Sequence, residues 1–211
     1  MSRWLFFFRD WINYRRGGTL LLLSVLLVYS KGLKNGYSLD DIYGPQNPLV
    51  EKGISGIPQI FTTPMDVKAG DFYEYRPVSL TSFAVENSLF GKGRPMLSHL
   101  INLLLYALIC WVLFSLLFYL FPKSNATLLF FIALIFALHP LHTEVVCSLK
   151  NRDHLLSILG VLIAFRLIIK WVRSNTFYFL ILSGLVMGIA VLCKVSAVPW
   201  AVLMPFTLWY L

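Results

Sequence analysis

Two adjacent carboxylates, Asp40 and Asp41, lie within "NGYSLDDIYGPQNPLV" at residues 35–50, just after the first apolar run of the chain. Carboxylates in such a place are either turn residues on a wet loop or acid–base groups of an active site. Neighbouring side chains point in different directions on a helix or a strand, so the two cannot act as a matched pair on one atom. We predict that one reaches a reacting hydroxyl while the other orients a basic group or the backbone.

A second set of ionisable residues falls within "HPLHTEVVCSLKNRDHLL": His139, His142, Glu144, Lys150, Arg152 and Asp153. Such a set is either a solvated loop with helix caps or part of a binding pocket. A metal interpretation of His139, His142 and Glu144 matches no specific ligand spacing. No metal site is therefore predicted, and the need for a divalent metal stays open.

Polar residues also occur inside apolar runs. His99, Asn102 and Tyr106 are spaced i, i+3, i+7, which places them on one helical face, for interhelical hydrogen bonds or for a pocket. Lys194 separates two apolar runs and either extends to the lipid headgroups or joins that pocket. Together these residues predict an outward-facing polar pocket walled by helices.

The composition excludes a soluble globular domain. Of 211 residues, 58% are hydrophobic and only 13% are charged, whereas soluble domains carry about 25% charged residues. The 16% of aromatic residues is typical of membrane proteins. The net charge of +8 is then a matter of membrane topology, and we predict no nucleic-acid partner. The three cysteines give no disulfide framework.

Apolar runs predict an all-α polytopic membrane protein with about six transmembrane helices. The spans are 18–33, 97–121, 126–145, 155–171, 177–194 and 195–211. The third is purely apolar only over residues 126–138, too short for a hydrocarbon core of about 30 Å. We expect the first helix to be uncleaved, because no small-residue cleavage site follows it, and the chain to be truncated after Leu211.

Loop charges predict the orientation. Residues 1–17 hold four Arg and one Asp, and the connectors 122–125 and 170–175 are also basic, so these segments are expected in the cytoplasm. The loops 31–95 and 139–153 are neutral and are expected outside. Within residues 34–95, Pro and Gly predict an irregular first half, and apolar spacing from Ser79 to Gly91 predicts an amphipathic helix on the membrane surface. Residues 96–211 hold the remaining five helices.

Eight short motifs in order resemble the membrane half of the transmembrane and tetratricopeptide-repeat-containing proteins. They are "DDIYGPQNPLV", "IFTT", "YRPVSLTSF", "LFGKG", "HLINLLLYAL", "ALHPLHTEVV", "KNRDHLLS" and "LCKVSAVPW", from Asp40 to about Pro199. That family belongs to the C-type glycosyltransferase superfamily and is similar to protein O-mannosyltransferases. The resemblance implies a C-type fold, a polyprenyl-phosphate-linked sugar as donor, and an acceptor hydroxyl on protein Ser or Thr.

The resemblance also implies roles for individual residues. Asp40 and Asp41 match the family's acidic pair, and we favour Asp40 as the catalytic base. Arg76, Arg152 and Lys194 are the implied donor-phosphate-binding residues, since cationic groups stabilise a departing phosphate. The implied pocket comprises His99, Asn102, His139, His142, Glu144 and Asp153. Asn151 stands where the family often has Gly, and Val195 replaces the acid that usually follows the lysine, which puts the role of Lys194 in doubt.

Three functions are open at this point. The first is a glycosyltransferase in the endoplasmic reticulum or a bacterial inner membrane, with its site on the extracytoplasmic side. The second is a non-catalytic membrane anchor or scaffold for a C-terminal repeat domain. A transporter is disfavoured, because transporters carry charged groups near the bilayer midplane, whereas the charged groups of this chain are expected at the outer face.

Overall fold

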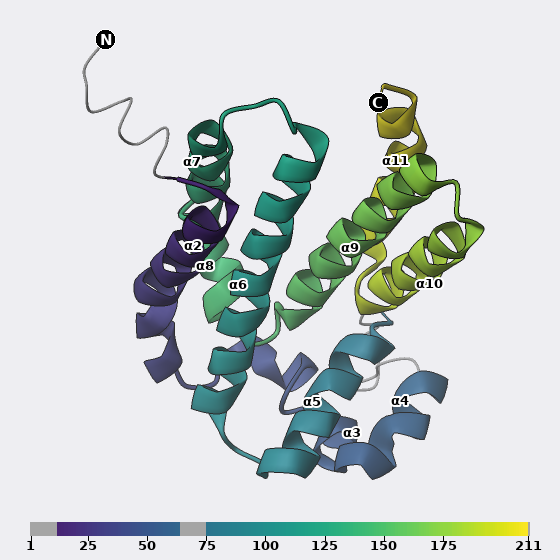
Figure 1. Ribbon diagram of the computed structural model, residues 1–211. Helices are drawn as coiled ribbons and strands as arrows, with labels where there is room; N and C mark the ends of the chain where they lie inside the picture. Colours follow the sequence, from purple (N-terminus) through teal and green to yellow (C-terminus); the bar gives the residue numbers. More distant parts are fainter. Residues whose placement is uncertain (1–11, 64–74, 211) are drawn as a thin grey trace.

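The protein is helical throughout the parts that the computed structural model describes, residues 12–63 and 75–210, with side chains described up to residue 206 (Figure 1). The predicted all-α polytopic class is confirmed. The apolar helices are α2 (Tyr14–Tyr29), α6 (Pro95–Leu120), α7 (Ala126–Ala137), α9 (Arg152–Ser174), α10 (Phe177–Cys193) and α11 (Val198–Tyr210). Residues 1–11 of the basic N-terminal segment lie outside the described residues.

Local sequence sets the ends of these helices. The Asn13 side chain accepts a hydrogen bond from Arg16 N at 3.0 Å, and the Asn125 side chain accepts one from Thr127 N at 2.8 Å, so asparagine caps begin α2 and α7. Pro95 occupies the first turn of α6, where its missing N–H is not needed. Asn175 closes α9 in the left-handed conformation, with φ of 50°.

Within the described residues, three helical segments are long and apolar enough to cross a membrane: Tyr14–Lys34, Pro95–Leu120 and Arg152–Ser174. The first comprises α2 and the 3-10 turn η1 (Ser30–Lys34). The helices α7, α10 and Val195–Phe206 are shorter. The predicted spans, about six in number, correspond to these three long and three shorter apolar helices. The end of α7 at Ala137 agrees with the short third run.

The helices alternate in direction, so connectors gather at two ends (Figure 1). The α6–α7 and α9–α10 connectors lie at the upper end with the start of α2, and the segments that follow α2, α8 and α10 lie at the lower end. The main core joins α2, α6 and α7 with α8 (His142–Cys147) and the first half of α9 around Leu21, Val25, Phe114 and Leu155. This alternation is the arrangement that the loop charges assume; which end is cytoplasmic stays a prediction.

A small helical unit, here called the outer module, forms the lower end. It comprises η2 (Leu39–Tyr43), α3 (Pro48–Glu51), η3 (Gly53–Gly56), α4 (Ile57–Thr62) and α5 (Pro77–Phe90). The expectation of an irregular first half is wrong over most of the described residues 34–63, because Pro48 and Pro58 occupy first turns of short helices. The predicted helix near Ser79–Gly91 is confirmed as α5, but its apolar side chains Leu80 and Phe83 are buried in the module's own core.

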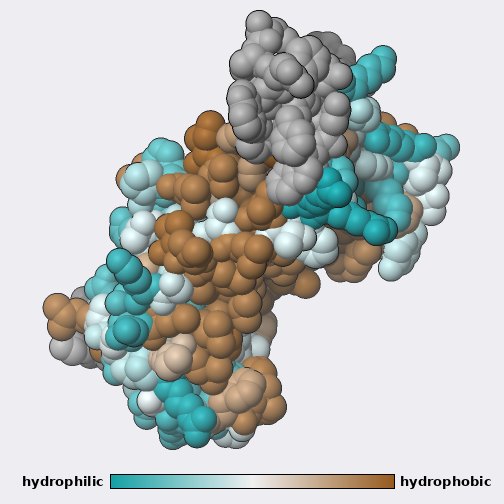
Figure 2. Space-filling view, turned by 60° about the vertical axis from the view of Figure 1, so that its left-hand side comes forward, coloured by the Kyte–Doolittle hydropathy of each residue, from teal (hydrophilic) through white to brown (hydrophobic). Residues whose placement is uncertain are grey.

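The molecular surface carries an apolar region of the kind that lipid covers. On the face shown in Figure 2, hydrophobic residues spread across the middle of the molecule, and hydrophilic residues lie toward its margins. Exposed apolar side chains on the helices include Leu27, Ile135, Leu185 and Phe206. A soluble protein rarely exposes apolar surface on this scale, so the surface agrees with an integral membrane protein.

Candidate functional site

The two adjacent carboxylates face opposite environments. Asp41 is 1% exposed, and its carboxylate accepts backbone N–H groups from Ser38 at 2.7 Å and from Lys150 at 3.0 Å. The Asp40 side chain is 62% exposed, and its Oδ2 lies 3.0 Å from Lys150 Nζ. The divergence expected of neighbouring residues is confirmed. Both carboxylates hold the same residue, one through its backbone and the other through its ammonium group.

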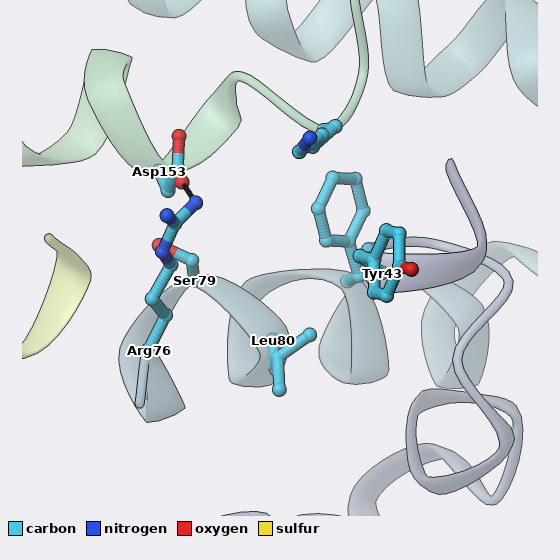
Figure 3. A pocket seen from close by; sticks show the side chains of 8 residues that line it. Tyr43, Arg76, Ser79, Leu80 and Asp153 are labelled. Carbon is cyan, nitrogen blue, oxygen red and sulfur yellow. Dashed lines mark hydrogen bonds and ion pairs between the residues drawn. The ribbon is translucent and has the colours of Figure 1, made fainter. Parts of the chain in front are cut away.

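A small pocket lies beside this pair, between the outer module and the start of α9. It is lined by Tyr43, Gly44, Arg76, Ser79, Leu80, Phe83, Lys150 and Asp153 (Figure 3). In that view Arg76 and Asp153 point toward one another at one side, Tyr43 lies at the other, and Leu80 lies between them. Two cations and one carboxylate therefore line a pocket whose remaining walls are mostly apolar.

The carboxylate of Asp153 is shared by two cations. Arg76 Nη1 pairs with Asp153 Oδ2, and Lys194 Nζ lies 3.3 Å from the same oxygen. Lys194 Nζ also contacts His154 Nε2. The three charged side chains are at most 13% exposed, so water screens them little. Asp153 thus joins two cationic side chains, and arginine and lysine are the groups that proteins use to bind anionic ligands.

Three separate elements bring this cluster together. Arg76 precedes Pro77, the first residue of α5, and Asp153 lies in the first turn of α9, where a helix favours negative charge. Lys194 occupies the break between α10 and the 3-10 turn η4 (Val195–Ala197), in an extended conformation with φ of −161°. Ser79 Oγ donates to the Cys193 carbonyl at 3.2 Å, which fastens α5 to the end of α10. Lys194 is thus ion-paired rather than extended to the headgroups.

Arg152, next to Asp153 in sequence, lies in a different environment. It is 1% exposed and donates to the Asn102 side chain at 2.8 Å, to Glu86 Oε2 at 2.6 Å and to the Ser98 carbonyl at 3.0 Å. Its guanidinium also stacks 3.7 Å from the Phe83 ring centroid. These contacts place Arg152 in a buried network that joins α5, α6 and α9, and Arg152 is not among the residues that line the pocket.

The other predicted pocket residues are dispersed. Of the six, only Asp153 lines the pocket. His99, Asn102 and Tyr106 share one buried face of α6 as expected, and Asn102 also donates to the Ser148 carbonyl at 3.1 Å. This face of α6 makes hydrogen bonds within the protein. Of the two alternatives left open by the sequence, interhelical hydrogen bonds or a pocket, the structure shows the first. Glu144 and His139 are exposed.

His142 belongs to a separate cluster below α7. Its Nδ1 lies 2.7 Å from the Tyr106 hydroxyl, and the Tyr29 hydroxyl donates to the Ala137 carbonyl at 3.1 Å. Burial lowers the pKa of His142, with a smaller contribution from nearby His139. Within the described residues, no three His, Cys, Asp or Glu side chains are grouped as a metal site, so His139, His142 and Glu144 do not form one there.

Sequence reasoning missed several lining residues. Tyr43, Ser79, Leu80 and Phe83 carry no pattern that separates them from ordinary loop and core residues. Lys150 had a signal, because it belongs to the ionisable set within residues 139–153, but it was given no role. The contact between Lys150 and Asp40 links residues that are 110 positions apart in the chain. Residue spacing alone does not predict such a contact.

These features define a class: an all-α polytopic membrane protein with a cation-rich pocket at one end of its helices. The chain belongs to the family of transmembrane and tetratricopeptide-repeat-containing (TMTC) proteins. It is 31% identical over 163 residues to the mouse protein O-mannosyl-transferase TMTC1, covering 69% of this chain. It is 32% identical over 154 residues to the human TMTC1, again 69% of this chain. The mouse TMTC3 matches 87% of the chain at 28% identity over 197 residues.

The chain spans only a small part of these relatives, namely 16%, 17% and 20% of their lengths. No family model matches the chain. No solved structure matches it either.

Proposed function

We propose that this chain forms the donor site of a membrane glycosyltransferase, which transfers a sugar from a polyprenyl phosphate to a Ser or Thr hydroxyl of a protein. The names of the relatives, protein O-mannosyl-transferases, support mannose as the sugar and a protein as the acceptor. The observation that carries the proposal is the cation-rich pocket of Arg76, Lys150 and Asp153 beside the exposed carboxylate of Asp40, at the end of lipid-facing helices.

The reaction needs two groups that this site offers. As the acceptor oxygen attacks the anomeric carbon, a base takes the hydroxyl proton, and exposed Asp40 is the candidate. The bond from the anomeric carbon to the phosphate oxygen breaks, and the lipid leaves as a phosphomonoester. Arg76, with Lys194 behind Asp153, is placed to stabilise the negative charge that gathers on that phosphate.

The neighbouring residues support this site without touching substrate. We assign Arg152 to the buried network that fixes the start of α9, and Asp41 to the fold of η2. This revises the role that the resemblance implied for Arg152 and keeps Arg76 and Lys194 as phosphate-binding residues. The polyprenyl chain would lie along the apolar helices in the bilayer, with the site on the extracytoplasmic side of the endoplasmic reticulum or a bacterial inner membrane.

The test is transfer of labelled mannose from mannosyl polyprenyl phosphate to a Ser- and Thr-containing acceptor, by the full-length protein in lipid nanodiscs. Arg76→Gln removes a preorganised charge from the leaving phosphate and should lower the rate by about 10²–10³-fold. Arg94→Gln is the matched control, because Arg94 is an exposed arginine at the same end of the molecule.

Two results would contradict the proposal. One is a wild-type protein that inserts normally yet transfers no sugar from any polyprenyl phosphate, which would favour the non-catalytic scaffold. The other is an Arg76→Gln variant as active as Arg94→Gln, which would move the chemistry away from this pocket.

A further inference from the structure

We infer that Lys150 is an exchangeable counter-ion, which pairs with Asp40 in the resting site and transfers to the phosphate as the lipid monophosphate forms. The inference rests on the proposed function and adds a residue and a charge movement to it. Its starting point is that Lys150 contacts both carboxylates of the acidic pair and also lines the pocket.

The backbone of Lys150 is fixed, and its ammonium group lies at the end of a flexible side chain. Asp41, which is buried, accepts the Lys150 N–H at 3.0 Å, and the next residue but one, Arg152, is locked in its network. The four-carbon stem of lysine then rotates about a stationary Cα. In the present arrangement Nζ lies 3.0 Å from Asp40 and 5.7 Å from the centre of the Tyr43 ring. Tyr43 lines the pocket, so the ammonium group already lies at the pocket's edge.

The pairing with Asp40 is easily exchanged. The Asp40 side chain is 62% exposed, and ion pairs with such exposure contribute little free energy. The pair of Arg76 with Asp153 is different, because the two side chains are only 10% and 2% exposed. Separating that buried pair would leave a desolvated charge without compensation. Of these two pairs beside the pocket, the one made by Lys150 is the mobile one.

The charge balance of the reaction explains why Lys150 would change its partner. Before transfer, the donor is a phosphodiester with one negative charge, and Asp40 carries another. After transfer, the acceptor proton is on Asp40, which is now neutral, and the phosphomonoester carries up to two negative charges. The total is unchanged, but one negative charge has moved from Asp40 to the phosphate. Lys150 pairs with Asp40 and lines the pocket in which we place the phosphate, so its ammonium group can follow that charge.

The experiment measures binding rather than turnover. The full-length protein in phosphatidylcholine nanodiscs is titrated with two probes, a polyprenyl monophosphate and its methyl phosphodiester. The variants are Lys150→Gln, Lys150→Arg, Asp40→Asn, the double variant Asp40→Asn/Lys150→Gln, and Arg76→Gln. Lys92→Gln is the control, since Lys92 is an exposed lysine on the turn between α5 and α6.

We expect Lys150→Gln to weaken monophosphate binding by about 10- to 100-fold, the effect of one charged hydrogen bond, and phosphodiester binding by less. Asp40→Asn should tighten monophosphate binding, because it releases Lys150. The double variant should bind like Lys150→Gln alone, Lys150→Arg should bind like wild type, and Lys92→Gln should change nothing.

A purely structural role predicts a different pattern. If Lys150 only holds Asp40 in the fold of the loop, Asp40→Asn and Lys150→Gln will weaken the binding of both probes to the same extent. That result would overturn the inference. Loss of binding in Arg76→Gln with wild-type binding in Lys150→Gln overturns it too, while the proposed function stands. A wild-type protein that binds neither probe refutes both.

Discussion

Asp40 and Asp41 carry the same carboxylate one peptide bond apart, and the fold gives each a separate task. The carboxylate of Asp41 accepts hydrogen bonds from two backbone N–H groups, whereas the exposed carboxylate of Asp40 pairs with the Lys150 ammonium group. Adjacent residues on a 3-10 turn diverge for geometric reasons, which the sequence alone predicts. Asp41 turns inward through a local contact with the Ser38 N–H and a distant contact with the Lys150 N–H, and only the local contact can be expected from spacing in the sequence.

This division predicts opposite effects for two similar substitutions. Asp40→Asn should leave the thermal midpoint near that of wild type and lower transfer by about 10²–10⁴-fold, the usual effect of losing a positioned base. Asp41→Asn replaces an accepting oxygen with a donor and should destabilise the protein by about 1–3 kcal/mol. Thermal unfolding in nanodiscs and donor-dependent transfer measure the two effects. Near wild-type transfer by both single variants and by the double variant would remove the acidic pair from the mechanism.

His142 predicts a pH effect on stability. Burial lowers its pKa below the ordinary value of about 6.5, so as the pH falls the unfolded chain takes up the proton before the folded protein does. The stability that neutral His142 contributes is therefore present above about pH 6.5 and is lost as the pH falls through the folded pKa. The thermal midpoint should drop between about pH 7 and pH 5, and less so in His142→Gln. A His142→Gln variant that keeps the wild-type slope would exclude His142 as the cause.

Among the elements, α5, α6 and α9 meet at one buried ion pair, Arg152 with Glu86. Removing one partner leaves the other charge buried and unpaired, which costs about 3–5 kcal/mol. Arg152→Met and Glu86→Met should each destabilise the protein by about that amount, and the double variant should recover most of the loss. Chemical denaturation of the three variants in detergent checks this. A double variant that is as unstable as the sum of the singles would show that the network needs its charges.

Hydropathy predicts where most helices begin and end, because each apolar run must form its own backbone hydrogen bonds in lipid. The helices α6, α9 and α10 fall within about three residues of the predicted spans, and the polar break after Ala137 is also expected from sequence. The outer module is less predictable, since its short helices are stabilised mainly by packing around Phe83 and Ile60. The same limit applies to the site: a sequence shows that Arg76, Arg152 and Lys194 are cations, but only tertiary packing separates the buried Arg152 from the two that share Asp153.

At the scale of the whole molecule, the alternating helices predict a single orientation. The sequon Asn125-Ala126-Thr127 lies in the α6–α7 connector, at the end opposite the outer module, where Asn125 caps α7. If that end is cytoplasmic, Asn125 should carry no glycan when the protein is made in a eukaryotic host. The double change Lys92→Asn/Arg94→Thr creates a sequon at the other end and should be glycosylated. Glycan on Asn125 would reverse the orientation of every helix.

The short helix α7 has a consequence for the surrounding lipid. Its 12 residues rise about 18 Å, whereas the hydrocarbon core is about 30 Å thick. Such hydrophobic mismatch is relieved in part by thinning of the adjacent leaflet, which draws headgroups inward. The α7–α8 break lies toward the same end as the pocket, so a lipid phosphate arriving there would sit deeper than in the undisturbed bilayer. The membrane itself would then shorten the path from the leaflet to Lys150 and Arg76.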